Sequence, residues 1–386
     1  MIKIPLRYNI GSLLARWPGT LMTAGGIGLT VAIVVTMMAL VGGLESTFIE
    51  TGRDNQLIVI RQGSLNEVNS YFNRDLFQMI RFLPGVAKDD RGEALASGEI
   101  IVVINHARMG GESSNVLVRG LSDMGFVLHP EAKIVAGRRL NPGLREIMVS
   151  RSLSQRFQSM ALGDSIRFAR SEWKVVGIFD TGGTAYDSEV WADYNEIAQD
   201  WDRPIYSSIL LRADSPAAAD QIRRRVADDQ RINLQAISQR QYFAEQTSSS
   251  MGIRTLGFFI AVVMGIGACF AAMNMMYGAV MSRATEIAAL RAIGFRRRSI
   301  LASFLVESLI VGAAGGIIGC IVALPMHGVS TGTANFQAFS EILFNFRITP
   351  AIVLRGLLFA LTVGVLGGYL PARRAARTRL IDVMRE

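Results

Sequence analysis

Four long stretches without charged side chains constrain this chain more than any other feature. They occupy 17–44, 255–282, 308–326 and 356–372. About 20 apolar residues are needed for a helix to cross the hydrocarbon core of a bilayer. We therefore expect four transmembrane helices in this chain of 386 residues, half of which are hydrophobic. A purely soluble enzyme is excluded.

The segment 45–254, between the first two apolar stretches, has a different character. It carries 25 basic and 27 acidic residues. At roughly 210 residues it is large enough to bury a core of its own, which excludes a channel made only of helices. Short β-branched runs bounded by turn residues predict strands at 56–60, 99–104, 115–118, 165–168, 173–178 and 208–211. Helical spacing occurs at 74–82, 151–160 and 216–228, the last after the start signal Ser215-Pro216. We expect an α+β domain with two subdomains, called here the inserted domain.

These patterns predict one transmembrane helix, the large inserted domain, and then three transmembrane helices. The expected boundaries are an N-terminal cytoplasmic or interfacial helix at 1–18, TM1 at 19–44, the extracytoplasmic α+β domain at 45–253, TM2 at 254–282, a cytoplasmic loop at 283–299, TM3 at 300–326, a short external loop at 327–349, TM4 at 350–372 and a cytoplasmic basic tail at 373–386.

The distribution of arginine and lysine predicts the orientation, because short loops rich in these residues stay in the cytoplasm. Thirteen basic residues fall in the two terminal segments and in 283–299, and the acids there are Glu286, Asp382 and Glu386. Both termini and this loop are therefore expected in the cytoplasm, with 45–253 on the other side. The pI near 9.9 then describes a membrane surface, and a nucleic-acid partner has little support.

The chain offers little that resembles an active site. A phosphate-binding P-loop needs a glycine directly before its lysine, and none of the lysines at 3, 88, 133 and 174 follows one. The three histidines are scattered, and both cysteines, Cys269 and Cys320, fall inside predicted spans. The inserted domain must then fold without disulfides, and no zinc ligand set is indicated. We expect no catalytic residue and no metal site.

The loop 283–299 predicts a short amphipathic helix. Ile287, Leu290 and Ile293 form a narrow apolar stripe, while Glu286 and Arg291 lie on other faces. Gly294 is suited to a left-handed cap that ends this helix. Ser299 is suited to cap the next helix. Periodicity alone also fits a helix that rests on the lipid interface.

The run Glu286-Ile-Ala-Ala-Leu-Arg-Ala-Ile-Gly294 resembles the signature E-I-x-x-L-R-A-x-G of permeases in the MacB, LolC/LolE and FtsX group of ABC transporters. The order of elements is also similar to that family. So are the glutamate and glycines of the third helix, from Phe304 to Gly319, and the tail Pro371-Ala-Arg-Arg-Ala-Ala-Arg377. The chain departs from the family pattern after this tail, at Leu380 and Met384-Arg385. Trp173-Lys-Val-Val-Gly177 resembles a strand of the MacB-type domain.

The resemblance implies that 284–293 is a coupling helix that docks on a cytoplasmic P-loop ATPase, with the mechanotransmission mechanism of type VII transporters. The residues implied in this coupling are Glu286, Ile287, Leu290, Arg291, Ile293 and Gly294. ATP and Mg would bind the partner ATPase, and this chain would bind no cofactor. Other implied partners are membrane lipid, a second permease copy in a homodimer or a related heterodimer, a periplasmic adaptor and an outer-membrane channel. The implied location is the bacterial cytoplasmic (inner) membrane.

The implied function is a permease subunit for export or periplasmic handling of a hydrophobic, peptidic or lipidic substrate. Lipoprotein release is an alternative. A further alternative is an FtsX-like signalling scaffold that activates a cell-wall hydrolase, and a sensor without an ATPase remains open. No charge bias or aromatic stripe in the inserted domain indicates which substrate is taken.

Two features inside the predicted spans invite interpretation. Glu307 lies about 12 Å into the third span, counted at 1.5 Å per residue, where an acid must be paired or hydrated. Pairing with a basic residue near the cytoplasmic ends and a functional role are both open. Small-residue faces predict close helix packing, within one chain or across a dimer, at Gly312, Gly315, Gly316, Gly319, Gly364 and Gly368.

Overall fold

A computed structural model describes residues 6–377, apart from 203, 230, 247–250 and 336–339. Its contacts divide the chain into two compact units. The helical unit comprises Met1–Gly42, Gly252–Val329 and Phe346–Glu386, and the inserted domain comprises Gly43–Met251 together with Ser330–Asn345. The last segment was expected to be a short external loop at 327–349, and instead it is a structural part of the inserted domain.

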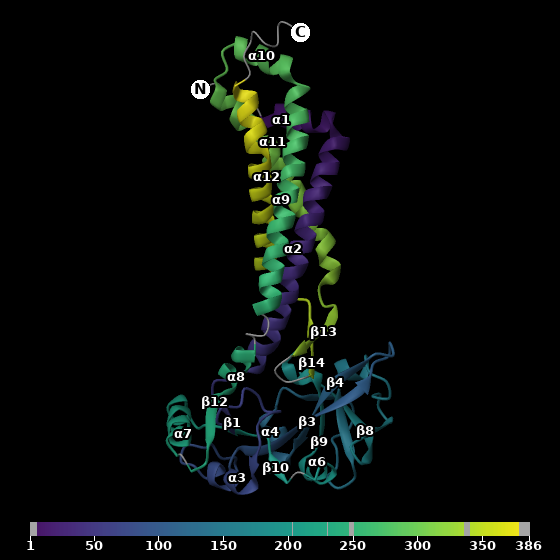
Figure 1. Ribbon diagram of the computed structural model, residues 1–386, viewed down its shortest axis with the longest axis vertical. Coiled ribbons are helices and arrows are strands. Elements are labelled where there is room, and N and C mark those ends of the chain that lie inside the picture. The colour runs from purple at the N-terminus through teal and green to yellow at the C-terminus, as the bar shows by residue number, and fades with distance from the viewer. Residues whose placement is uncertain (1–5, 203, 230, 247–250, 336–339, 378–386) are drawn as a thin grey trace. The chain divides into compact units, whose positions relative to one another are not determined.

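The helical unit is built on four long apolar helices, as predicted. These are α2 (Trp17–Thr51), α9 (Met251–Met281), α11 (Arg297–Ala323) and α12 (Pro350–Arg377). Each is long and apolar enough to span a membrane. They run as a bundle (Figure 1), and α1 (Leu6–Ala15) and α10 (Ala284–Ala292) lie at one end of it. The segment that links α11 to α12 begins with the short helix η3 (Leu324–Met326).

Two helices run past the boundaries expected from the apolar stretches. The 35 residues of α2 extend about 50 Å at 1.5 Å per residue, more than the roughly 30 Å hydrocarbon core. The C-terminal part of α2, from Gly43 on, therefore belongs to the inserted domain. Helix α12 continues through Pro371 to Arg377. The rest of the basic tail, including Arg379, Leu380 and Arg385, lies outside the described residues.

The inserted domain is organised around one mixed sheet. The order of its strands is β12-β1-β11-β3-β4-β9-β6-β8-β5, and β7 also pairs with β8. Most neighbours are antiparallel, but β4–β9 and β6–β8 are parallel. The strands are β1 (Gln56–Arg61), β3 (Ala96–Ala107), β4 (Ser113–Leu121), β5 (Lys133–Gly137), β6 (Glu146–Ser150), β7 (Ser165–Phe168), β8 (Ser171–Asp180), β9 (Glu189–Asp193), β11 (Ser208–Arg212) and β12 (Leu234–Ser238).

Short helices and two small sheets complete this domain. The small sheets pair β2 (Phe72–Asn73) with β10 (Ile205–Tyr206), and β13 (Ser330–Asn335) with β14 (Ser340–Asn345). The helices are α3 (Arg74–Arg81), α4 (Asp123–Leu128), α5 (Arg151–Ser154), η1 (Ala185–Ser188), α6 (Tyr194–Asp200), α7 (Pro216–Asp228) and α8 (Gln239–Gln246).

The sheet carries two separate apolar cores, in agreement with the two expected subdomains. One core gathers side chains of β1, β11 and β12 with those of α3 and α7, including Leu57 and Ile222. The other gathers side chains of β4, β6, β8 and β9, including Trp173 and Val190. The six strands predicted from sequence all form, and the fold class is confirmed.

Two local predictions had different outcomes. Ser215 caps α7 by accepting a hydrogen bond from the Ala218 N–H at 3.2 Å, with Pro216 in the first turn, so this helix begins where predicted. The helix predicted over 151–160 ends at Ser154. Beyond it, the Gln158 N–H donates to Ala107 and the Met109 N–H donates to Arg156. The chain there pairs with the end of β3, and this places Phe157 in the core.

Candidate functional site

The turn from α10 to α11 follows from one glycine. Gly294 has φ +104°, a left-handed conformation that only glycine adopts without strain. The Phe295 N–H then donates to the Leu290 carbonyl, which closes the last turn of α10. Helix α11 begins at Arg297 after the extended residue Arg296. Ser299 was expected to cap α11, and that expectation was wrong, because Arg296 occupies the cap position and accepts the Ser299 N–H.

The apolar stripe of α10 divides into a buried and an open part. Ile287 is 3% exposed. It packs in one cluster with Met276 and Val280 of α9, Ile300 and Phe304 of α11, and Ala372 and Ala375 of α12. Leu290 is half-buried, and Ile293 is 73% exposed. Ile287 thus fixes α10 to three long helices, while Leu290 and Ile293 remain accessible to a partner.

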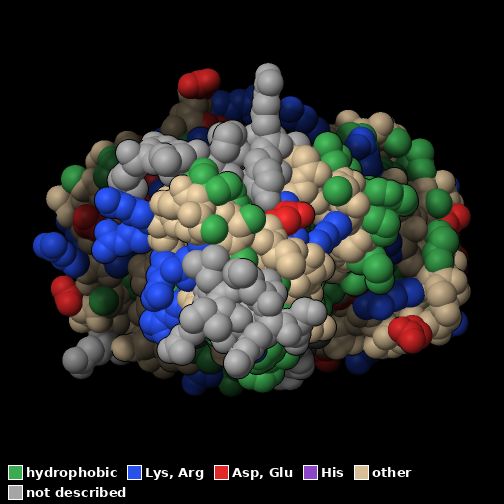
Figure 2. All heavy atoms as spheres, turned by 90° about the horizontal axis from the view of Figure 1, so that it is seen from above, with side chains coloured by type: hydrophobic (Ala, Val, Ile, Leu, Met, Phe, Trp, Pro, Cys, Tyr) green, Lys and Arg blue, Asp and Glu red, His purple; other side chains and the backbone are tan. Residues whose placement is uncertain are grey.

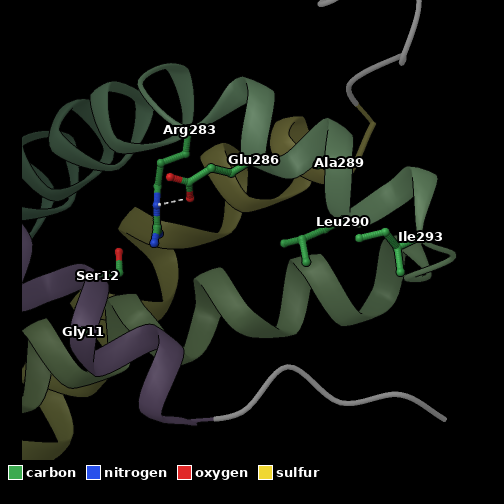
Figure 3. Close-up of a pocket in the computed structure, with 7 residues that line it drawn as sticks. All are labelled: Gly11, Ser12, Arg283, Glu286, Ala289, Leu290 and Ile293. Carbon is green, nitrogen blue, oxygen red and sulfur yellow. Dashed lines mark ion pairs between the residues drawn. The ribbon is translucent and has the colours of Figure 1, made fainter.

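Arg283 forms the polar counterpart of this attachment (Figure 3). Its guanidinium lies 3.3 Å from the Glu286 carboxylate on α10 and 3.3 Å from the Glu307 carboxylate on α11. The Ser12 hydroxyl of α1 donates to the other Glu307 oxygen at 3.3 Å. Arg283 and Glu307 are both buried. The acid in the third span is therefore paired with a base near the end of the bundle, and the pair connects three helices.

A groove of about 490 Å³ opens beside this cluster. Its lining comes from α1, the start of α10 and the open face of α10, as Figure 3 shows. The lining residues are Gly11, Ser12, Arg283, Glu286, Ala289, Leu290 and Ile293. The walls of the groove are mostly apolar, with charged groups at one side. Such a groove suits an apolar side chain of a partner protein that is flanked by a polar residue.

Exposed arginines lie at the same end of the helical unit. The arginines with exposed side chains are Arg296, Arg297, Arg298, Arg373, Arg374 and Arg377. Figure 2 views the molecule from this end and shows basic side chains on it. Arg291 is half-buried on α10. A surface of this kind attracts anionic lipid headgroups or an acidic protein face.

The small residues of α11 lie on two faces, each directed at a different helix of the same chain. Gly312 and Gly316 approach α12 at Ala360, and Gly364 and Gly368 of α12 approach Ser308 in return. Gly315 and Gly319 approach α2 at Ala24 and Gly28. A Cβ atom at Gly319 would collide with the Gly28 carbonyl. Close packing within one chain therefore accounts for all six glycines.

Sequence reasoning missed a buried charge cluster in the inserted domain. The Arg119 guanidinium contacts the carboxylates of Glu67 at 3.0 Å, Glu99 at 2.7 Å and Glu189 at 2.7 Å. All four side chains are buried. The residues lie on different strands and a loop, so no spacing along the chain indicated the cluster. On the strands, these charged residues nearly alternate with apolar ones, which is the pattern expected of a strand with one face in solvent.

His129 extends this cluster. Its Nε2 lies 3.4 Å from Glu99 and its Nδ1 lies 3.2 Å from Glu131. Burial by itself lowers the pKa of His129, but its hydrogen bond to Glu131 and the nearby carboxylate of Glu99 prevail and raise that pKa to about 9. Among the described residues, no group of three His, Cys, Asp or Glu side chains is arranged to hold a metal ion. The charge cluster joins β3, β4 and β9 through buried side chains, and we interpret it as structural.

Comparison with known protein families matches both parts of the chain. Residues 20–229 match the MacB-like periplasmic core domain, and residues 257–380 match the FtsX-like permease C-terminal domain. The chain belongs to the MacB/FtsX family of ABC-transporter permeases. The second match contains α10, Glu307 and the six packing glycines. The permease is a multi-pass membrane protein in which the inserted domain corresponds to the periplasmic core domain of the family.

Two relatives in sequence agree with this assignment. The permease is 25% identical to the macrolide export ATP-binding/permease protein MacB of Sodalis glossinidius over 99% of its own length, but it spans only 60% of that protein. It is 23% identical to the uncharacterized ABC transporter permease YknZ of Bacillus subtilis, and the alignment covers 98% of each chain. Among solved structures, the extracellular domain of YknZ is 14% identical and covers 48% of the permease and 100% of that domain, with a TM-score of 0.36.

Proposed function

We propose that this permease transmits the work of a partner ATPase to its inserted domain, for export or extracytoplasmic handling of a hydrophobic, peptidic or lipidic substrate. The observation that carries the proposal is the division of α10 into two faces. Ile287 and Arg283 attach α10 to the long helices, and Leu290 and Ile293 face an open groove. A helix attached in this way moves the bundle when its open face is pushed.

The relatives support an ATPase as the partner. The printed name of the Sodalis protein combines ATP-binding and permease functions. No lysine of the present 386 residues follows a glycine, so a nucleotide-binding P-loop lies outside these residues. ATP and Mg act there, and this chain contributes no catalytic group. In the proposed orientation both termini and α10 are cytoplasmic and the inserted domain is extracytoplasmic.

In the proposed cycle two permease copies bind two ATPase domains. Closure of the ATPases around ATP displaces α10, and the displacement shifts the cytoplasmic ends of α9, α11 and α12 together because Ile287 packs against all three. The inserted domains then change their arrangement and act on substrate outside the cytoplasm. Such a cycle couples two distant sites through an element with two states.

The test is co-purification of the ATPase with the tagged permease in mild detergent. The docking variant Leu290→Asp with Ile293→Asp introduces charge on the open face of α10. The matched control is Thr285→Asp, at an exposed position of α10 that does not line the groove. We expect the ATPase with the wild type and the control, and its loss with the docking variant.

Two results would contradict the proposal. One is an ATPase that remains bound to the docking variant while that variant is correctly inserted in the membrane. The other is the absence of any P-loop ATPase from the wild-type preparation. Either result would leave α10 as an interfacial helix without a docking role.

A further inference from the structure

The β13–β14 hairpin lies between α11 and α12 in sequence, yet its contacts place it in the inserted domain. The domain is therefore assembled from two separate segments of the chain. Ile342, Leu343 and Phe344 of β14 are each no more than 5% exposed. Leu343 belongs to the same apolar core as Trp173 and Val190. The hairpin is integrated into the domain and does not merely rest on its surface.

Polar contacts fix the position of β14 within the domain. The Leu343 N–H donates to the Ser188 hydroxyl of η1 at 2.8 Å. The Glu341 carboxylate contacts Arg108 at 2.5 Å through one oxygen and Arg156 at 3.3 Å through the other. Glu341 is 3% exposed. A buried carboxylate with a cation on each oxygen is strongly destabilised when either cation leaves, so these contacts hold the hairpin at one place.

The hairpin also approaches the segment where α2 enters the domain. A Cβ atom added at Gly43 would collide with the Asn345 carbonyl. The backbone of β14 therefore packs directly against α2 at this point. A displacement of the hairpin would therefore disturb both the apolar core of the domain and the end of α2 at Gly43.

The connections from the hairpin to α11 and α12 are short and hydrogen-bonded. The Gly328 N–H donates to Phe346 at 2.9 Å, and the Phe346 N–H donates to Val329 at 3.0 Å. The Ile348 N–H donates to His327 Nδ1 at 3.1 Å. These bonds tie the two connecting segments to each other, so the ends of both helices join the hairpin at one place in the chain's path.

We propose that the β13–β14 hairpin transmits movement of α11 and α12 to the inserted domain, with Glu341 as the positioning residue that holds the hairpin to Arg108 and Arg156. The inference rests on the proposed function, because it needs an ATPase that moves these helices. It adds a third route to the direct chain connections through α2 and through α8–α9. Through this route, movement of α11, the helix that carries Glu307, reaches the apolar core of the inserted domain.

The experiment is hydrogen–deuterium exchange on the full permease–ATPase complex, with and without ATP. The variants are Glu341→Ala and Arg108→Ala, and Arg108→Ala keeps the contact of Glu341 with Arg156. The matched control is Glu112→Ala, which removes an exposed acid on the turn between β3 and β4. ATPase co-purification is recorded for each variant, so that loss of docking is separated from loss of transmission.

In the wild type and the control, we expect ATP to change amide exchange in both α10 and the inserted domain. In Glu341→Ala, exchange of the β14 amides rises about tenfold, as expected when one contact of a buried network is removed. The ATPase stays bound and α10 still responds to ATP, but the response of β3, β4 and η1 is lost. Arg108→Ala gives a weaker loss of the same kind.

The inference is overturned when both variants keep the full ATP response of the inserted domain. Should Glu341→Ala fail to fold, Arg108→Ala decides the question by the same measurement. If no ATPase accompanies the wild type, the proposed function fails and the hairpin has no movement to transmit. If the ATPase binds and α10 responds in every variant, only the role of the hairpin is at issue.

Discussion

At the scale of single residues, the inserted domain contains an unusual concentration of buried charge. Arg119 faces three carboxylates, and its guanidinium also lies 5.3 Å from the ring of Tyr186. Trp191 donates from its indole N–H to Glu189 at 2.9 Å, and Ser208 donates to Glu67 at 2.6 Å. The carboxylates are thus hydrogen-bonded as well as paired with a shared cation, which is the condition for keeping charge inside a protein.

Removal of Arg119 should therefore be costly. We expect Arg119→Met to lower the free energy of unfolding of the inserted domain by about 3–5 kcal/mol, because three carboxylates lose their shared cation. Protease resistance of the full-length permease across a urea series measures this. The control Arg223→Met removes the exposed pair with Asp220 and should change little. Equal stability of the two variants would show that the cluster does not depend on its arginine.

The same cluster predicts a pH dependence. The pKa of His129 is raised from 6.5 to about 9 in the folded protein. Protonated His129 therefore contributes stability that is fully present below about pH 6.5 and is lost as the pH rises through 9. We expect the unfolding midpoint of the inserted domain to fall between pH 6.5 and 9, and His129→Gln to flatten this slope. A slope that is the same in the variant would assign the loss to other groups.

At the scale of elements, sequence reasoning succeeded where local signals agreed with the tertiary structure. Helix α7 has both a serine cap and a proline in its first turn. The strand at 173–178 has an aromatic residue before Lys174 and β-branched residues after it. Sequence reasoning failed where contacts between residues far apart in the chain determine the secondary structure. The helix predicted to 160 stops because 156–158 pair with the end of β3. The hairpin at 330–345 looks like a loop, because β13 is made of serine, threonine, glycine, alanine and asparagine.

At the candidate site, too, the local features were predicted and the tertiary contacts were not. The i, i+3 spacing of Ile287 and Leu290 indicated an amphipathic helix, and Gly294 indicated its end. Spacing could not reveal that Ile287 packs inward while Ile293 is open, since both lie on one stripe. The link from Arg283 to Glu307 joins residues 24 positions apart, and it depends on how α9 and α11 lie together in the bundle.

The packing of α11 gives a prediction at this scale. Gly319→Leu should destabilise the helical unit by about 1–3 kcal/mol, because its side chain meets the Gly28 carbonyl and Val31 of α2. The matched control is Gly267→Leu in α9, where a Cβ atom meets nothing within 4 Å. Thermal aggregation of the detergent-solubilised permease measures the difference. Equal aggregation temperatures would argue against close contact between α2 and α11.

At the scale of the whole molecule, charge is distributed unevenly along the chain. Thirteen basic residues fall in the terminal segments and in 283–299, whereas the inserted domain is nearly neutral. The rule that basic loops stay in the cytoplasm is the basis of the orientation proposed for all four spans. The even number of spans returns the chain to the side from which it started, so both termini share the compartment of α10.

Cysteine labelling tests this orientation. After Cys269 and Cys320 are replaced by serine, a single cysteine is placed at Gln62 in the inserted domain or at Arg297 at the start of α11, both of which are exposed. We expect a membrane-impermeant maleimide to label Gln62→Cys in intact cells, and Arg297→Cys only after permeabilisation. The reverse pattern would contradict the proposed topology.

The discontinuous origin of the inserted domain has a consequence for biosynthesis. Most of the domain has been synthesised by Met251, but Leu343, a member of its core, follows roughly 90 residues later. At 5–20 residues per second, this delay is about 5–20 s. The nascent domain must wait, with part of its apolar core uncovered, until α9, α11 and the hairpin have been synthesised. In the proposed topology, completion of the domain also requires that α2, α9 and α11 have been inserted in the membrane.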